Sequence, residues 1–374
     1  CTTIHLFSIL IHLDRLLFFF FFSVVCAVYS QEDLESGIYK MENTDSSLNH
    51  LKSMAFAIDS GETQKLRVFH FGDSHIQPDN FTGEIRRQVQ AIHGNGGRGV
   101  IYPYTFAKTN GPKDFTVTSD VQWLSNWNIN YPHKFQLGLA GMSIKSTAEN
   151  GYVLISLKKD TLSNPYTKAI LYYSFENKEA GRIALNKGES KTGMIGEFDT
   201  ISVQTSATND LRIDFSGSKI IIHAIYFEND QSGVVYSSIG VAGARYQDFN
   251  RTAHFFDQYQ VLDPDVVVIS LGTNESYDPK YNERLFQSEV DSLITKLKAL
   301  NPNVEIILTL PSENYRVKNG VPIENNKLDS ISAILRMQAE KHNCAIWDLK
   351  KAMGGNGSML VWYKEGFVNK DHVH

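Results

Sequence analysis

A serine at the end of a predicted strand is the first residue that could carry covalent chemistry. The apolar segment 66–71 runs directly into Gly72, Asp73 and Ser74. Ligands of open α/β sheets bind outside the carboxyl ends of the strands, so a serine at this point would face the crevice. Gly-Asp-Ser is also ordinary turn chemistry, which makes Ser74 alone a moderate indication of a nucleophile. We expect His75 to pack or to form hydrogen bonds away from the reaction.

Two further positions follow predicted strands and could stabilise negative charge. Gly243 comes after the strand 234–239, and Asn274 comes after the strand 265–270. A serine hydrolase needs donors aimed at the developing oxyanion, each worth about 2.7–4 kcal/mol. The N–H groups of Gly243 and Ser74 and the side-chain amide of Asn274 could supply them. Taken singly, the glycine would be interpreted as a helix-start residue and the asparagine as a helix N-cap.

The end of the chain could supply a base and its orienting acid. The last four residues, 371–374, are Asp-His-Val-His. An aspartate three residues before a histidine can orient the imidazole, which then takes the serine proton. We therefore expect Asp371 and His374 to complete a catalytic triad with Ser74. His372 and His374 could instead bind zinc together with the aspartate, but no other cluster has the spacing of a zinc motif, so we predict no metal.

The elements that must position these residues alternate along the chain. Strands are predicted at 66–71, 234–239, 265–270, 304–310 and 345–349, and helices at 80–93, 246–259, 282–300 and 327–342. Such alternation predicts a three-layer α/β domain with a parallel sheet, of flavodoxin-like architecture.

The pattern changes between the first two strands of this domain. Short alternating segments, separated by Gly, Asn, Asp and Ser, occur at 152–157, 169–175, 199–204, 211–215 and 220–227. They predict an antiparallel β-sandwich at 115–230, inserted into an α/β domain made of 66–114 and 231–374. The polar segment 31–65 is a helix-compatible lead-in. The glycine-rich segment 94–99 follows a helix, so we predict a flexible connection there and not a phosphate-binding loop.

The N-terminus is typical of an exported protein. An apolar stretch at 16–28 precedes a small residue and then a polar segment, which predicts a signal peptide at 1–30 and a secreted or periplasmic location. A lipoprotein anchored at Cys26 ranks second. A retained membrane anchor ranks third, because the stretch is shorter than the roughly 20 residues of a bilayer span. Membrane association is expected only through this segment.

Composition excludes some classes of function. The net charge of −5 and the absence of a long basic run argue against a nucleic-acid partner. After cleavage Cys344 would be the one cysteine left, and we expect it to be a core residue that forms no disulfide. The chain begins with Cys1 and stops at His374, so we expect the natural protein to differ at both ends.

The ordered set of residues resembles the GDSL/SGNH hydrolase family, over roughly 66–112 and 233–374. The Ser, Gly, Asn and His of the family name correspond to Ser74, Gly243, Asn274 and His374. The sequence departs from the family pattern at His75, which gives GDSH. The long stretch before the glycine block is similar to peptidoglycan O-acetylesterases, which carry an inserted carbohydrate-binding-module-like β domain beside the catalytic site.

The resemblance implies a carboxylic ester hydrolase that removes O-acetyl groups from cell-wall peptidoglycan and needs no cofactor. Trp123, Trp127 and Tyr131 are candidates for stacking on sugars, although such residues are more often core material. Other substrates remain open, namely a xylan-like polysaccharide or a short-chain lipid ester. A non-catalytic glycan-binding protein is the alternative from a different class.

Overall fold

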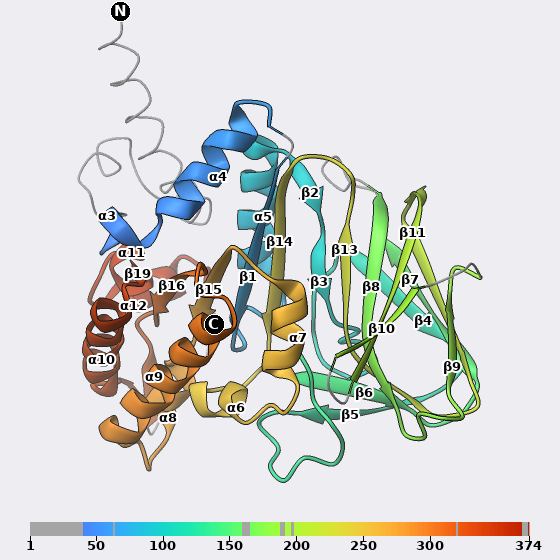
Figure 1. The fold of residues 1–374 in the computed structure, drawn as a ribbon. Coiled ribbons are helices and arrows are strands. Elements are labelled where there is room, and N and C mark those ends of the chain that lie inside the picture. Colours follow the sequence, from blue (N-terminus) through green and yellow to red (C-terminus); the bar gives the residue numbers. More distant parts are fainter. Residues whose placement is uncertain are drawn as a thin grey trace, which may run out of the picture.

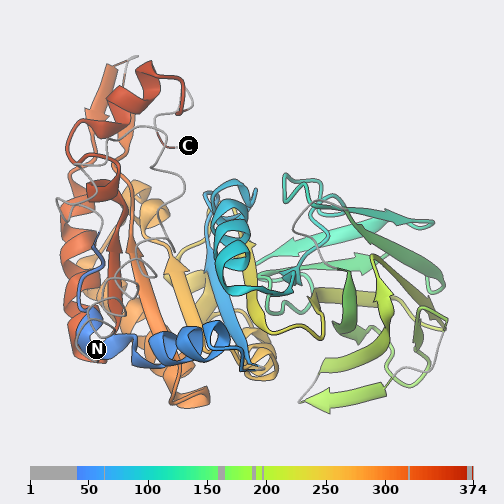
Figure 2. The same cartoon turned by 90° about the horizontal axis from the view of Figure 1, so that it is seen from above.

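A computed structural model describes residues 40–62, 64–158, 165–187, 191–195, 198–318, 321–368 and 373. The predicted signal peptide at 1–30 lies outside these residues, as do Asp371 and His374. Two parts lie side by side, an α/β part and a part built almost wholly from strands (Figures 1 and 2). This division agrees with the predicted fold class.

The α/β part is organised around one parallel sheet. Its strands, in spatial order, are β19 (Ala345–Asp348), β16 (Glu305–Leu310), β15 (Val266–Ser270), β1 (Lys65–Gly72), β14 (Gly233–Gly240) and β2 (Asn95–Gly97). Without the short β2, this is the flavodoxin-like order, in which the first strand lies between the second and the third. All five predicted strands are therefore confirmed.

Helices cover both faces of this sheet because its strands are apolar on both sides. Val266 and Val268 of β15 point to the face covered by α4 (Asn49–Asp59) and α5 (Asn80–His93). Val267 and Ile269 point to the opposite face. The helices on that side are α7 (Phe255–Leu262), α9 (Glu283–Leu300) and α10 (Lys327–His342).

Two predictions for this part were wrong. The helix predicted at 246–259 is divided into α6 (Tyr246–Asn250) and α7. Between them the Thr252 hydroxyl donates to the Asp248 carbonyl at 2.8 Å, a local side-chain bond that competes with helix continuation. The glycine-rich segment 94–99 is not a flexible connection, because it forms β2 and begins β3 (Gly99–Ile101). A Cβ at Gly97 would lie 2.5 Å from the Glu228 Cα, so the glycine there permits close strand approach.

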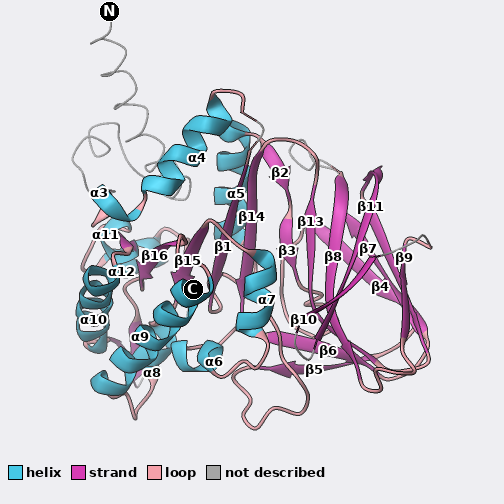
Figure 3. Cartoon of the chain, in the orientation of Figure 1, coloured by secondary structure: helices cyan, strands magenta, loops and turns pink. Residues whose placement is uncertain are grey.

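The inserted part consists of two antiparallel sheets and contains no helix among its described residues (Figure 3). The first sheet runs β10 (Lys191–Ile195), β11 (Phe198–Thr208), β8 (Tyr166–Phe175), β13 (Ile220–Glu228), β6 (Met142–Ser146) and β5 (Trp123–Trp127), with β3 also paired to β13. The second runs β4 (Phe115–Ser119), β7 (Gly151–Leu157), β12 (Asp210–Ser216) and β9 (Arg182–Leu185). The five predicted strands of this part are present.

The remaining elements are short. They are α3 (Thr44–Ser47), α8 (Thr273–Tyr277), α11 (Leu349–Ala352), α12 (Ser358–Lys364) and the hairpin of β17 (Tyr315–Lys318) and β18 (Val321–Glu324). In the part of the chain that the structure describes, no helix is long and apolar enough to cross a membrane.

The core is continuous between the two parts. One hydrophobic cluster contains Phe69 and Val267 of the parallel sheet together with Leu171 and Ile225 of the insert. The insert therefore packs directly against the domain that it interrupts. The lead-in also belongs to this domain, since Leu51 of α4 is buried against the parallel sheet.

Candidate active site

Ser74 lies in a tight turn that directly follows β1. The Ile76 and Gln77 N–H groups both donate to the Asp73 carbonyl at 3.2 Å, so the chain turns immediately after the strand. Gly72 is required at the strand end, because a Cβ there would lie 2.4 Å from the Ser270 carbonyl oxygen. Ser74 is half-buried at the carboxyl edge of the sheet, as predicted for a nucleophile position.

The loop after β14 carries Gly243 and is bonded to the serine turn. The Gln77 side-chain oxygen accepts from the Ala242 N–H at 2.7 Å. Gly240 allows this contact, since a Cβ at that position would lie 2.1 Å from the Gln77 nitrogen. Gly243 itself is exposed and has a φ of 86°, in the left-handed region that favours glycine.

Asn274 lies after β15 and joins the other two loops. Its Nδ2 donates to the Ala244 carbonyl at 3.0 Å and approaches Asp73 Oδ2 at a longer 3.4 Å. The N-cap of α8 is Gly272, so Asn274 is not the cap of that helix. The loops that carry Ser74, Gly243 and Asn274 are therefore bonded to one another along the carboxyl edge of neighbouring strands.

His75 connects the serine turn to the end of the chain. Its Nδ1 lies 2.9 Å from Asp73 Oδ1, and its Nε2 lies 2.9 Å from the Val373 carbonyl oxygen. Both ring nitrogens are engaged in these contacts, so His75 forms hydrogen bonds, but one of them goes to the chain end and not away from it. Val373 directly precedes the predicted base, His374, in the sequence and is the one residue of 369–374 that the structure describes.

Two buried ionisable groups beside the site were not predicted from the sequence. His70 of β1 bonds Tyr236 Oη at 2.7 Å and Ser270 Oγ at 2.6 Å, and burial lowers its pKa to about 3. Burial raises the pKa of Glu275 to about 7, although its carboxylate accepts from the Tyr246 N–H at 2.8 Å. Periodicity marks such positions as buried, but it does not show which polar partners they meet.

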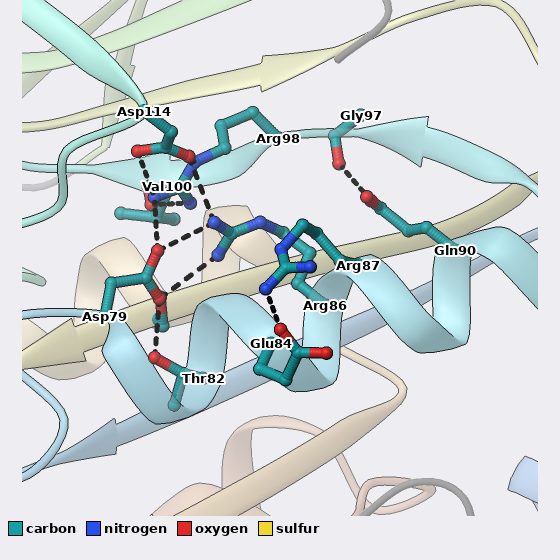
Figure 4. Close-up of polar contacts among 11 residues, drawn as sticks. Asp79, Thr82, Glu84, Arg86, Arg87, Gln90, Gly97, Arg98, Val100 and Asp114 are labelled. Atoms are coloured by element: carbon teal, nitrogen blue, oxygen red, sulfur yellow. Dashed lines mark hydrogen bonds and ion pairs between the residues drawn. The ribbon is translucent and has the colours of Figure 1, made fainter. Parts of the chain in front are cut away.

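A second polar cluster lies where the chain passes from the serine turn into α5 (Figure 4). Asp79 is buried and accepts from the Nη1 and Nη2 atoms of Arg86, at 3.2 and 2.7 Å, and from Arg98 at 3.1 Å. Asp114 accepts from Arg86 at 3.0 Å and also bonds Arg98. Burial by itself would raise the pKa of Asp79, but the two guanidinium groups outweigh it and lower the pKa overall.

The aromatic candidates for sugar stacking differ in exposure. Trp123 is 8% exposed and lies in the core, stacked on Phe106 and edge-on to Phe215, so its ring cannot serve as a sugar platform. Trp127 is half-buried against the same core. Tyr131 is 73% exposed, in a loop of the insert.

This loop reaches Gly243. The Ile129 Cδ1 atom lies 3.6 Å from the position that a Cβ on Gly243 would occupy. Ile129 is two residues before Tyr131 in the loop that follows β5. The insert therefore borders the side of the site where Gly243 is exposed.

The sequence also contains residues that could take part in metal binding or thiol chemistry. Among the described residues, no group of three or more His, Cys, Asp or Glu side chains could hold a metal ion. The alternative zinc set at 371–374 lies outside these residues except for Val373. Cys344 is buried, and burial raises the pKa of its thiol to about 12, so the prediction of a core cysteine is confirmed.

The fold and these loops define a flavodoxin-like α/β domain with a serine at the carboxyl edge of its sheet. Residues 224–371 match the GDSL-like Lipase/Acylhydrolase family. This part of the α/β domain is therefore similar to that family of lipases and acylhydrolases. The matched region begins beyond the serine turn, so Ser74 is assigned by its place in the sheet. A search of curated proteins found no match.

One solved structure resembles both parts of this chain in fold. A peptidoglycan O-acetylesterase superposes with a TM-score of 0.78 at 21% identity, covering 90% of this chain and 93% of that one. An acetyl xylan esterase (AlAXEase) matches at 22% identity with a TM-score of 0.30, over 39% of this chain and 74% of its own. A lipase/acylhydrolase from Enterococcus faecalis matches at 19% identity with a TM-score of 0.29, over 38% and 68% of the two chains. The first of these shares the whole two-part fold.

Proposed function

We propose that this chain is an exported serine esterase that removes O-acetyl groups from a glycan. The glycan that we propose as its substrate is cell-wall peptidoglycan. The observation that carries the proposal is the bonding of the Ser74, Gly243 and Asn274 loops to one another at one sheet edge. A solved peptidoglycan O-acetylesterase with the same two-part fold supports the choice of substrate.

The proposed reaction is acyl transfer in two steps. The Ser74 Oγ attacks the acetyl carbonyl carbon while His374, oriented by Asp371, accepts the hydroxyl proton. The tetrahedral intermediate then expels the sugar oxygen, which takes that proton and leaves as an alcohol. Water, deprotonated by the same histidine, attacks the acetyl-serine carbonyl. The second tetrahedral intermediate expels the Ser74 oxygen, which takes the proton back from the histidine, and acetate leaves. No cofactor enters either step.

The oxyanion of each intermediate needs preorganised donors. In the proposal these are the N–H groups of Ser74 and Gly243 and one side-chain N–H of Asn274. The Asn274 amide has two N–H donors, and one of them holds the Ala244 carbonyl at 3.0 Å. The other makes only the long 3.4 Å approach to Asp73, so it is the donor that can turn to an oxyanion.

Acetate release from a substrate panel tests the proposal. The panel contains O-acetylated peptidoglycan, acetylated xylan, a short-chain triglyceride and p-nitrophenyl acetate. Ser74→Ala should reduce release from peptidoglycan at least about a thousandfold, because the nucleophile is lost. Ser206→Ala, at an exposed serine of β11, is the matched control and should act as the unchanged protein does.

The outcomes separate the parts of the proposal. Release within tenfold of normal by Ser74→Ala would refute the nucleophile. Release from xylan or triglyceride without release from peptidoglycan would overturn the substrate and keep the esterase. Binding to insoluble cell wall with no hydrolysis of any panel member would favour the non-catalytic alternative.

A further inference from the structure

One buried histidine connects the three strands whose ends carry the proposed nucleophile and oxyanion donors. His70 lies in β1, the strand that leads to Ser74, and it is fully buried. On one side its Nδ1 lies 2.7 Å from the hydroxyl oxygen of Tyr236, in β14. On the other side its Nε2 lies 2.6 Å from the hydroxyl oxygen of Ser270, the last residue of β15. The ring is therefore bonded to both neighbours of β1 in the parallel sheet.

The three strands lead to different residues of the proposed site. β14 continues into the loop that carries Gly243, and β15 continues beyond Ser270 to Asn274. Ser270 lies beside Gly72 in register, and a Cβ at Gly72 would lie 3.0 Å from the Ser270 Cβ. In a close-packed interior, a shift of Ser270 would therefore be passed to Gly72, two positions before Ser74.

The chemistry of the ring suits this position. Burial lowers the pKa of His70 to about 3, against the opposing effect of the Asp79 charge, so the imidazole is neutral at pH 7. A neutral imidazole has one N–H donor and one acceptor nitrogen, and a hydroxyl group can serve either. Thr309 of β16 bonds Ser270 Oγ at 2.7 Å and extends the row of polar side chains to a fourth strand. Such a row favours one arrangement of the strand ends, because breaking a bond within it leaves a buried polar group without compensation.

We propose that His70 is a positioning residue, which holds the ends of β14, β1 and β15 at a spacing that suits the reaction. In this role it sets the distance between the nucleophile Ser74 and the two oxyanion donors, Gly243 and Asn274. Such donors act at about 2.7–3.1 Å, so a small shift of one strand end weakens them. The inference rests on the proposed function, because this spacing matters only if the three residues act on one ester carbonyl.

The insert supplies a matched control for these contacts. His223 of β13 is also fully buried, and burial lowers its pKa to about 3. Its ring lies between the hydroxyl oxygens of Ser143 and Ser174, at 2.7 and 3.1 Å. Ser270→Ala and Ser143→Ala therefore each remove one hydroxyl partner from a buried neutral histidine. Only the first of these changes lies at the strand ends of the proposed site.

The kinetics of a small ester test the proposal. Ser270→Ala should lower kcat for p-nitrophenyl acetate about 10- to 100-fold and leave KM within about twofold, because misplaced groups slow the chemical step and not binding. Ser143→Ala should keep kcat within about twofold of the unaltered protein, since its histidine has no part in the spacing of the three strands. Urea unfolding of both variants shows that each is folded in the assay.

A double variant tests whether the loss passes through the ring. His70→Phe removes both ring hydrogen bonds, keeps a ring in the core and should lower kcat at least as much as Ser270→Ala does. The double variant should then be no more than about twofold slower than His70→Phe alone, because the two changes break the same bond. Losses that multiply would show that the two residues act independently, and would overturn the inference. The comparison of the two serine variants decides the question if His70→Phe does not fold.

The two proposals fail in different ways. A folded Ser270→Ala protein with an unchanged kcat, or an equal loss of kcat in Ser143→Ala, would refute the positioning role and leave the esterase intact. An unaltered protein that hydrolyses no ester of the panel would refute the esterase and with it the positioning role.

Discussion

Glu275 is a buried carboxyl group whose bonds position two loops of the site. Its carboxylate accepts from the first N–H of α6, and its neighbour Asn274 bonds the Ala244 carbonyl, so the loops after β14 and β15 are joined twice. Burial raises the pKa of Glu275 to about 7, with Asp73 adding to the effect. At a pH between the ordinary glutamate pKa and 7, Glu275 therefore carries a proton in the folded protein and has lost it in the unfolded chain.

This difference makes stability depend on pH in a known direction. Between the ordinary glutamate pKa and 7 the folded state holds more protons, so the free energy of unfolding falls as pH rises through that window. Glu275→Gln keeps an acceptor for the Tyr246 N–H and removes the titration. We expect its unfolding free energy, relative to the unaltered protein, to increase by about 2–3 kcal/mol between pH 5 and pH 8.

Urea unfolding at the two pH values checks this expectation. Glu340→Gln, at an exposed position of α10, is the control and should show no such difference. An equal offset of Glu275→Gln at both pH values would show that the buried carboxyl group is not protonated in the folded state.

At the residue scale, residues that belong to a recognisable motif could be predicted from the sequence. Residues whose role depends on a distant contact could not. Ser74, Gly243 and Asn274 could be named because each follows an apolar strand, and strand ends meet at one edge. The roles of Gln77 and His70 depend on partners more than 160 positions away, such as Ala242 and Tyr236. Without an alignment, a single sequence contains no signal for such pairs.

The segment from the serine turn to the start of α5 is fixed by buried ion pairs. Asp79 precedes α5 and has a φ of 58°, a conformation that needs support from its surroundings. The support comes from Arg86 within the helix and from Arg98 between β2 and β3, while Asp114 joins the cluster from the edge of the insert. These ion pairs therefore hold the start of α5, the segment between β2 and β3 and the edge of the insert together, next to the turn that carries Ser74.

Removal of one partner from this cluster should be costly. Asp79→Asn removes a negative charge that compensates two buried guanidinium groups. We therefore expect a loss of about 3–5 kcal/mol of unfolding free energy at pH 7. The pKa of Asp79 is lowered in the folded state, so its contribution is fully present above the ordinary aspartate pKa and is lost progressively as pH falls from there toward the lower folded pKa. The gap between variant and unaltered protein should narrow at pH 3.

Urea titrations at pH 7 and pH 3 measure both effects. Asp329→Asn removes a carboxylate whose side chain is 85% exposed, and serves as a control with little expected change. A loss below 1 kcal/mol for Asp79→Asn at pH 7 would contradict the role given to the cluster.

At the element scale, periodicity predicted the long elements and missed short ones. The strands of the parallel sheet and α5, α9 and α10 were foreseen because their apolar patterns are long and uninterrupted. The strands β5 and β6 were not, since five residues with several polar side chains give little alternation. Only pairing with β13 and with each other makes these segments strands.

At the scale of the whole molecule, the insert places an aromatic side chain at the border of the proposed site. Tyr131 is 73% exposed, and Ile129 of the same loop lies 3.6 Å from the Cβ position of Gly243. A tyrosine ring offers an apolar face that can pack on a sugar. In the proposed function this loop binds the glycan beside the acetyl group that is removed.

The comparison of a polymer with a small ester tests this role. Tyr131→Ala should raise KM for O-acetylated glycan up to about tenfold, since one aromatic contact contributes about 0.5–1.5 kcal/mol. Hydrolysis of p-nitrophenyl acetate should not change. Phe56→Ala, at an exposed aromatic residue of α4, is the control. Equal losses on both substrates would show that the loop supports the catalytic site and does not bind sugar.

The position of the insert also has a consequence for synthesis. β1 pairs with β14, so that Lys65 meets Gly233, and the other neighbour of β1 is β15. A ribosome that adds about 5–20 residues per second makes both neighbours on the order of ten seconds after β1. During that interval the newly made strand that leads to Ser74 has no permanent partner, while the antiparallel pairs of the insert can already form. In the nascent chain the insert can therefore form before the parallel sheet is complete.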